Sequence, residues 1–338
     1  MPAHNGSNGG SNGGANGGPR SFEEISEELF EQSRAIQDLA ESALAAPDDA
    51  RKIAEAERLL DGFFEADESK AASILTSALE VDPGCVEALT ITARALDDPT
   101  DASILLEAAV QVAERRLGDK MFEQMKGKFW DIQQTRPYMR ALLALAESQM
   151  DEMDYGAGLD SYCRLLELSD RDALHVRFTL TSALLAADQV ERAREIAFDR
   201  FGDDDAPSLL WSRTLILYLE RDFDGAAAML ERAREACPGV ELYLLGELEL
   251  AEEAPEPDST LPADVADLAA RDQMVGWRSR PLSLIWLKVG GKPGDDRYFG
   301  ALTDPDLDLL GGFEDDDELF DDDFDDLEDE DDEPYLLN

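Results

Sequence analysis

The chain has 338 residues, and its 77 Asp and Glu against 30 Lys and Arg give a formal net charge of −47. A chain this acidic lacks the broad basic face that neutralises nucleic-acid phosphates, and it is repelled by anionic membrane surfaces. A hydrophobic content of 43% is enough for a sizeable core, whereas two His and three Cys supply few groups for metal or nucleophile chemistry. Composition therefore favours a folded, non-enzymatic protein over a nucleic-acid-binding protein, a membrane-surface protein or an enzyme.

Residues 1–20 are rich in Gly, Asn and Ser, and they predict a disordered tail without the apolar region of a secretory signal. Nowhere in the chain do about 18 uncharged apolar residues follow one another, so no membrane-spanning helix is expected. The three cysteines lie far apart within apolar helical patterns, as is typical of reduced, buried thiols. These features predict a cytoplasmic protein.

Residues 21–250 have an almost entirely helical periodicity. The region begins with a capping box, in which Ser21 precedes Glu24 by three residues. Turn-forming Pro and Gly then recur at short intervals, as at residues 82–84 and 238–239. The pattern predicts an all-α chain of short antiparallel helices.

Small residues recur where the two helices of a repeat would pack closely: Ala71, Ala102, Gly158, Ala193 and Ala226. Their separations are 31, 56, 35 and 33 residues, and three of these lie near the period of about 34 residues of helix–turn–helix repeats. The pattern resembles the tetratricopeptide repeat, which implies an α-solenoid of about five helix pairs over residues 21–250. The long separation indicates an insertion at about residues 112–135. An irregular helical bundle is the alternative.

The residue composition changes after the predicted repeats. Residues 251–290 contain closely spaced prolines and then Trp277 and Trp286, which predicts a linker and helices that cap the solenoid. Residues 291–338 predict a disordered acidic tail, because residues 304–333 alone hold 19 acidic residues and no Lys or Arg follows Arg297.

One segment is basic, although the chain as a whole is acidic. Residues 115–140 hold seven bases and three acids, interleaved with aromatic residues. Because Arg and aromatic side chains carry much of the binding energy at interfaces, this segment is a candidate anion-binding or partner-binding site. The residues that we expect to bind the partner are Lys128, Trp130, Arg136, Tyr138 and Arg140. In the alternative interpretation, Trp130 and Tyr138 fill the gap between repeats while Arg side chains cover them.

The same segment resembles a known family. Phe129-Trp130, followed by the string TRPYMRALLALA from Thr135 to Ala146, is similar to the suppressor-of-tumorigenicity-7 family and its soluble prokaryotic relatives. The resemblance extends over roughly residues 50–290, and it implies a tetratricopeptide-type helical-repeat protein with no assigned catalytic residues. The chain departs from the membrane-associated eukaryotic members because it has no spanning segment, and from the prokaryotic members in its acidic tail.

Specific chemistries are excluded by the residues that they need. A clamp that holds an acidic peptide terminus needs Asn side chains in the repeats, but Asn occurs only at positions 5, 8, 12, 16 and 338. His175 is expected to be a packed or surface side chain, and the calcium-like run that starts at Asp304 has Leu309 where a glycine is needed. No phosphate-binding loop, metalloprotease motif or serine-nucleophile motif is present. We therefore expect no cofactor, no metal and no catalytic residue.

Two functions remain open. The first is a protein-interaction scaffold that binds an extended segment of a partner protein in the groove of the repeats. The second is an acidic chaperone or mimic whose tail shields a basic partner. The charges also predict that the acidic tail folds back on residues 115–140 and competes with an outside ligand.

Overall fold

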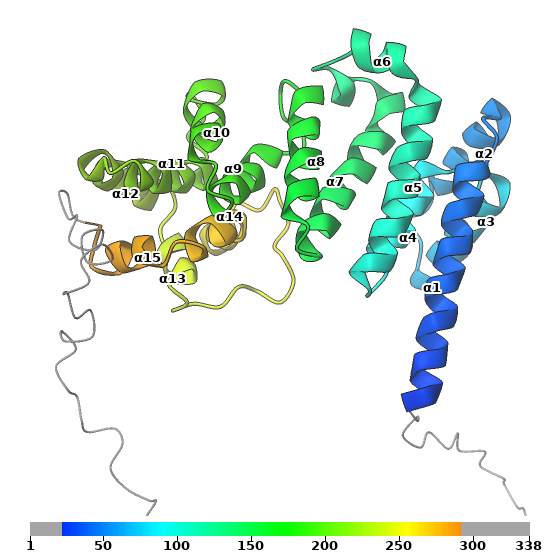
Figure 1. Ribbon diagram of the computed structural model, residues 1–338, viewed down its shortest axis with the longest axis horizontal. Coiled ribbons are helices and arrows are strands. Elements are labelled where there is room, and N and C mark those ends of the chain that lie inside the picture. Colours follow the sequence, from blue (N-terminus) through cyan, green and yellow to red (C-terminus); the bar gives the residue numbers. More distant parts are fainter. Residues whose placement is uncertain (1–21, 292–338) are drawn as a thin grey trace, which may run out of the picture.

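The computed structural model describes residues 22–291 (Figure 1). Within this part the chain forms fifteen α-helices and no β-strand beyond one isolated bridged pair, so the predicted all-α fold is confirmed. The disordered tails predicted at residues 1–20 and 291–338 fall outside the described residues, except for residue 291.

Most helices pack as consecutive antiparallel pairs, and each pair packs on the next. The first helices of the five pairs are α2 (Ala50–Leu60), α4 (Val86–Arg94), α7 (Arg136–Asp151), α9 (Val176–Ala186) and α11 (Pro207–Leu219). The second helices are α3 (Glu68–Val81), α5 (Pro99–Leu117), α8 (Tyr155–Leu168), α10 (Val190–Arg194) and α12 (Phe223–Ala236). A π-helical stretch, Glu195–Arg200, prolongs α10, and a long first helix, α1 (Phe22–Ala45), packs on α5. We call the surface formed by α2, α4, α7, α9 and α11 the first-helix layer.

The five small residues that recur in the sequence all lie in second helices, on α3, α5, α8, α10 and α12. Gly158 shows why the position is restricted. A Cβ atom there would lie 2.7 Å from Sδ of Met150 and 3.3 Å from the carbonyl oxygen of Ala146, both on α7. A larger side chain would push the two helices of the pair apart.

Aspartate begins many of the helices, which gives part of the acidic composition a structural role. Side chains of Asp49, Asp67, Asp98, Asp154 and Asp222 accept hydrogen bonds from backbone N–H groups in the first turns of α2, α3, α5, α8 and α12. These bonds satisfy N–H groups that have no partner within the helix, and the carboxylates face the positive end of the helix dipole.

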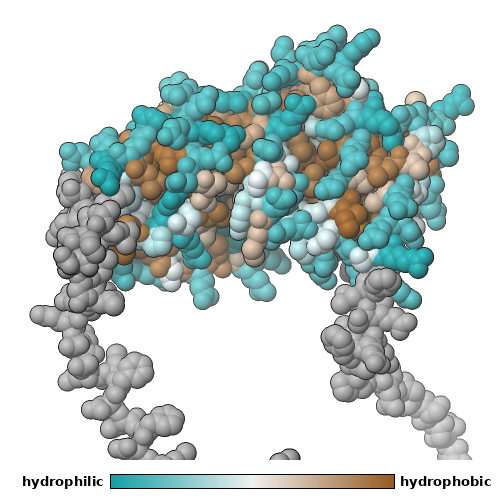
Figure 2. Space-filling model, in the orientation of Figure 1, coloured by the Kyte–Doolittle hydropathy of each residue, from teal (hydrophilic) through white to brown (hydrophobic). Residues whose placement is uncertain are grey.

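A continuous apolar core runs through the stacked pairs from α1 to the last helix, with a smaller cluster between α2, α3 and α4. Figure 2 shows that polar side chains cover most of the surface, while apolar side chains emerge in patches between them. The burial of the helix faces therefore stabilises the stack along its whole length.

The insertion lies between α5 and α7. It comprises the short helix α6 (Asp119–Gln124) and two 3₁₀ turns, Phe129–Asp131 and Gln133–Thr135. In Figure 1 it extends above the ends of α5 and α7. The turn between α6 and the first 3₁₀ turn contacts the segment after α8, where Asp170 donates its backbone N–H to the carbonyl of Gly127 at 2.8 Å.

The C-terminal helices are α13 (Val240–Leu244), α14 (Pro262–Arg278) and α15 (Pro281–Lys288). Helix α14 does more than cover the last pair, because it lies across both α9 and α11 (Figure 1). Trp277 of α14 packs edge-on against Trp211 of α11, with ring centroids 5.7 Å apart. Gly276 donates its N–H to the hydroxyl of Ser182 on α9 at 2.9 Å. Helix α14 therefore covers part of the first-helix layer.

Candidate partner-binding site

Four of the seven bases in the segment 115–140 are paired with carboxylates from other parts of the chain. Arg116 binds both oxygens of Asp82 at 3.0 and 2.9 Å, and Arg115 lies 3.2 Å from Asp48. Lys126 forms an ion pair with a glutamate of α8 at 3.3 Å. The local excess of positive charge in the sequence is therefore largely neutralised by the fold.

Arg140 is also paired. Its guanidinium group on α7 makes a two-pronged contact with Glu87 on α4, with N–O distances of 2.9 Å and 2.5 Å to the two carboxylate oxygens. Paired contacts of this kind fix orientation as well as charge. The ion pair joins two neighbouring first helices, α4 and α7.

Arg136 and Trp130 form a unit at the start of α7. The guanidinium carbon of Arg136 lies 5.6 Å from the centroid of the Trp130 ring, and its Nε donates to the carbonyl of Trp130 at 2.9 Å. Both side chains are partly buried, whereas Lys128 is exposed. No carboxylate among the described residues forms an ion pair with Arg136 or Lys128. The charges of these two residues are therefore available to an outside group.

Tyr138 lies inside the protein, with 1% of its side chain exposed. Its ring packs against Phe122 and Phe129, with centroids 5.2 and 6.0 Å away, and its hydroxyl donates to Glu114 at 3.1 Å. Burial, followed by the nearby charge of Glu114, raises the pKa of the Tyr138 hydroxyl above its usual range. Tyr138 thus fills the gap between α5, the insertion and α7, as the packing interpretation of the segment described.

Arg136 and Arg140 border an open cleft on the first-helix layer. We call it the N-terminal cleft, and its volume is about 620 Å³. It is lined by Glu57 and Leu60 of α2, Asp61 and Phe64 after α2, Glu87 of α4, Gln133 and Gln134 of the insertion, and Arg136, Pro137 and Arg140 of α7. The fold therefore brings two of the five residues expected to bind a partner to one cleft.

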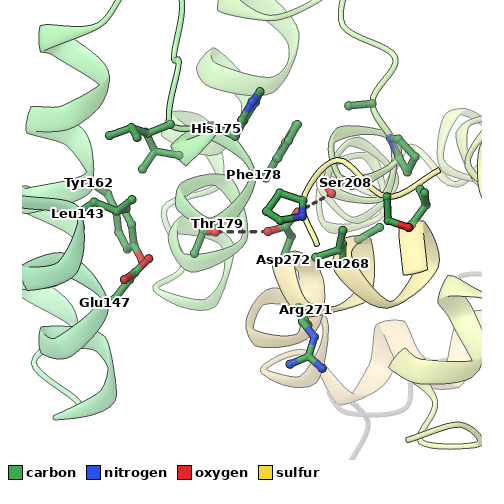
Figure 3. Close-up of a pocket in the computed structure, with 18 residues that line it drawn as sticks. Leu143, Glu147, Tyr162, His175, Phe178, Thr179, Ser208, Leu268, Arg271 and Asp272 are labelled. Atoms are coloured by element: carbon green, nitrogen blue, oxygen red, sulfur yellow. Dashed lines mark hydrogen bonds between the residues drawn. The ribbon is translucent and has the colours of Figure 1, made fainter. Parts of the chain in front are cut away.

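A second cleft lies on the same layer between α7, α9, α11 and α14, with a volume of about 490 Å³ (Figure 3). We call it the C-terminal cleft. Figure 3 shows Asp272 of α14 in its middle, between Thr179 of α9 and Ser208 of α11, with Glu147 and Tyr162 on the opposite wall. None of these residues was expected to contribute to a site.

Asp272 is the most perturbed carboxyl group of this cleft. It accepts hydrogen bonds from the hydroxyls of Ser208 at 2.6 Å and Thr179 at 3.5 Å. Burial raises its pKa to about 6, although both hydrogen bonds and the charge of Arg177 act in the opposite direction. Burial also raises the pKa of Glu147, against the effect of its ion pair with Arg94 at 2.6 Å.

The remaining polar residues of the cleft are engaged elsewhere. His175 stacks on Phe178 with ring centroids 6.0 Å apart, and its Nδ1 lies 3.1 Å from a nitrogen of Arg177. Arg271 turns away from Asp272 in Figure 3 and contacts Asp267 and the carbonyl of a linker residue. The arrangement leaves the carboxyl group of Asp272 without an ion-pair partner among the described residues.

Sequence patterns do not single out this cleft because its walls come from five helices, α7, α8, α9, α11 and α14, and from the linker before α14. Asp272 and Thr179 are 93 residues apart, and Asp272 and Ser208 are 64 apart. The only signal is a weak one, namely hydroxyl residues at positions of α9 and α11 where the helical pattern would accept apolar residues.

Across residues 22–291, no helix combines the length and apolarity needed to cross a membrane. In the same part of the chain, no group of three or more His, Cys, Asp or Glu side chains is arranged to hold a metal ion. The three cysteines are free thiols; Cys85 and Cys237 are buried and Cys163 is partly buried. The acidic segment 304–333 and its predicted contact with residues 115–140 lie outside the described residues.

In comparisons with known proteins, no protein-family model matches the chain, and no curated protein matches it.

Proposed function

We propose that this chain is a non-enzymatic, cytoplasmic interaction scaffold that holds an extended segment of a partner protein along its first-helix layer. The observation that carries the proposal is the N-terminal cleft, which is open, about 620 Å³ in volume and built from three successive first helices. Stacked helix pairs present such a layer as a long surface, which α14 covers at α9 and α11, and a long surface suits an extended chain better than a small ligand.

The lining of the N-terminal cleft has the mixture of groups that a peptide site needs. Phe64 lines the cleft and is 83% exposed, so it offers an aromatic anchor. Gln133 and Gln134 also line the cleft and are exposed, and their amide groups can both donate to and accept from a peptide backbone. Arg136 supplies a charge without an acidic partner, so an acidic side chain of the segment would complete it.

We also propose that the chain is a repeat protein similar to tetratricopeptide proteins and to the soluble relatives of the suppressor-of-tumorigenicity-7 family. The placement of the recurring small residues, one in each second helix, supports this similarity. The string from Thr135 to Ala146 then acquires a structural meaning, because it forms the start of α7 and borders both the buried aromatic cluster and the N-terminal cleft.

The test is selection of a random peptide library on the whole protein, followed by affinity measurement for the selected peptides. Arg136→Glu should weaken the binding of acidic peptides by about tenfold or more, because it replaces attraction with repulsion at the cleft. The fold should survive, since a carboxylate is favourable at the N-terminus of α7. The matched control is Arg232→Glu, an exposed arginine of the second helix α12.

A further variant keeps the ion pair while moving its charges. Glu87→Arg combined with Arg140→Glu preserves the contact between α4 and α7 but exchanges the two charges across the cleft. Peptides selected on the natural chain should lose affinity for this double variant. Recovery of no peptide above background, or equal losses for Arg136→Glu and Arg232→Glu, would contradict the proposed function.

A further inference from the structure

The C-terminal cleft presents a negative group to a ligand, whereas Arg136 presents a positive group at the N-terminal cleft. Its central group is the carboxyl of Asp272, and no Lys or Arg among the described residues forms an ion pair with it. Arg177, whose charge acts on Asp272, is paired with Asp172 and Asp204, and Arg271, which lines the cleft, is paired with Asp267. A partly buried carboxylate without a cation is costly, and a ligand that brings a cation would remove that cost.

Part of the wall around this carboxyl group is apolar, although Glu147 and Arg271 also line the cleft. Leu143 of α7 and Leu268 of α14 stand on opposite sides, with the ring of Phe178 above and that of Tyr162 beside Leu143 (Figure 3). Apolar walls that lead to one carboxyl group match a ligand with a flexible hydrocarbon stem and a cationic end.

The hydroxyl groups that flank Asp272 restrict the kind of cation. Thr179 donates to one carboxylate oxygen and Ser208 to the other, so each oxygen has already used one acceptor position. A rigid guanidinium fork needs both oxygens in matched positions, whereas an ammonium group is compact and can reach either oxygen with one of three donors.

We propose that the C-terminal cleft binds a lysine side chain of the partner segment, with its ammonium group on Asp272 and its methylene stem against Leu143 and Leu268. This inference rests on the proposed function, because it assumes that a polypeptide lies along the first-helix layer. It adds the chemistry of the segment: an acidic residue near Arg136 and a lysine near Asp272. The excess of acid over base in the chain would draw such a lysine toward the protein.

The experiment uses three pools of random peptides that differ only in one fixed central residue, which is Lys, Arg or norleucine. Norleucine keeps the hydrocarbon stem of lysine and lacks the charge. The whole protein should retain the Lys pool roughly tenfold better than the norleucine pool at moderate salt. Asp272→Asn should reduce that ratio to about one, because the amide presents no negative charge.

Two further variants separate a specific contact from general attraction. Asp160→Asn removes one charge from an exposed position on α8 and should leave the ratio unchanged. Leu268→Lys places an ammonium group four residues before Asp272 on α14, where it can form an i,i+4 ion pair. This internal cation should occupy the site and abolish the preference for the Lys pool while Asp272 is intact.

Each other outcome overturns the inference. Equal retention of the Lys and norleucine pools, both above background, would refute it while leaving the proposed function in place. Equal retention of the Arg and Lys pools, or equal effects of Asp272→Asn and Asp160→Asn, would refute the specific ammonium contact. Binding of n-butylammonium ion as tight as that of the Lys pool would show a small-amine site. Retention of no pool would refute the proposed function and the inference with it.

Discussion

Replacing Asp272 by Asn should make the protein more stable near neutral pH and change its stability little in acid. Burial raises the pKa of this carboxyl group from an ordinary value of 3.8 to about 6. Asn has nearly the shape of the protonated acid, and its carbonyl oxygen can still accept the hydrogen bond from Ser208. The variant therefore mimics the neutral state at every pH.

The direction of the pH dependence of stability follows from whether the folded or the unfolded state holds the proton of Asp272 more tightly. Between about pH 4 and pH 6 the folded protein retains a proton on Asp272 that the unfolded chain has lost, so this group favours folding below that window. Its contribution is lost as the pH rises through about 6. A shift of about two pKa units corresponds to roughly 3 kcal/mol, which is the amount by which Asn should stabilise the protein near pH 7.

The assay is urea denaturation of the natural chain and the variant at a series of pH values between about 4 and 7.5. The difference in unfolding free energy should rise from near zero to about 3 kcal/mol across this range. The other charged groups around Asp272 are the same in both proteins, so most of their contribution is common to the two and drops out of the difference. Asp160→Asn, which removes an exposed carboxylate on α8, is the control. A flat difference for Asp272→Asn, or a variant that loses stability as the pH rises, would refute the reasoning.

Three other substitutions test the packing. Arg116→Ala should lower the unfolding free energy by about 3–5 kcal/mol, because it leaves Asp82, a carboxylate with 2% exposure, buried without a cation. Gly276→Ala should cost about 1–3 kcal/mol in urea denaturation despite its better helix propensity, because the new Cβ would lie 2.9 Å from the carbonyl oxygen of Ser182. Tyr138→Phe should cost about 1 kcal/mol for one lost hydrogen bond and leave the affinity for selected peptides unchanged.

Matched substitutions control these experiments. Arg232→Ala removes an exposed ion pair and should cost no more than about 1 kcal/mol, so a similar cost at Arg116 would contradict the assignment of a buried network. Gly156→Ala adds a Cβ whose nearest neighbour is 3.8 Å away, and it should be neutral or stabilising. A loss of peptide affinity in Tyr138→Phe at unchanged stability would show that Tyr138 reaches the ligand.

The repeat architecture could be predicted because it depends on local patterns. Small residues such as Gly158 and Ala226 recur at the repeat period, and each lies in the second helix of a pair. Helix capping is another local feature, since Asp154 and Asp222 stand directly before α8 and α12 and cap them. Patterns of this kind express contacts between residues that are near each other in the chain.

The basic segment shows where such patterns fail. Seven bases close together in the sequence suggested a positive surface, yet Arg116 and Arg140 are paired with Asp82 and Glu87 from other helices. Tyr138 was expected to contact a partner and is buried, because an aromatic side chain looks the same in a sequence whether it fills a core or faces a ligand. The ion pairs of the two arginines and the burial of Tyr138 both depend on residues that are distant in the sequence, so local sequence patterns do not predict them.

The sequence by itself therefore determined an all-α chain and its stacked helix pairs. Only the tertiary structure decided that α14 lies across α9 and α11 and that Asp272 meets Thr179 and Ser208 in one cleft. The reason is physical: helix formation and pairing depend on short-range periodicity and capping, whereas a cleft depends on which faces remain after the core is buried. The acidic composition likewise indicates a solvated surface, while the one carboxyl group that we connect with binding is distinguished by its surroundings.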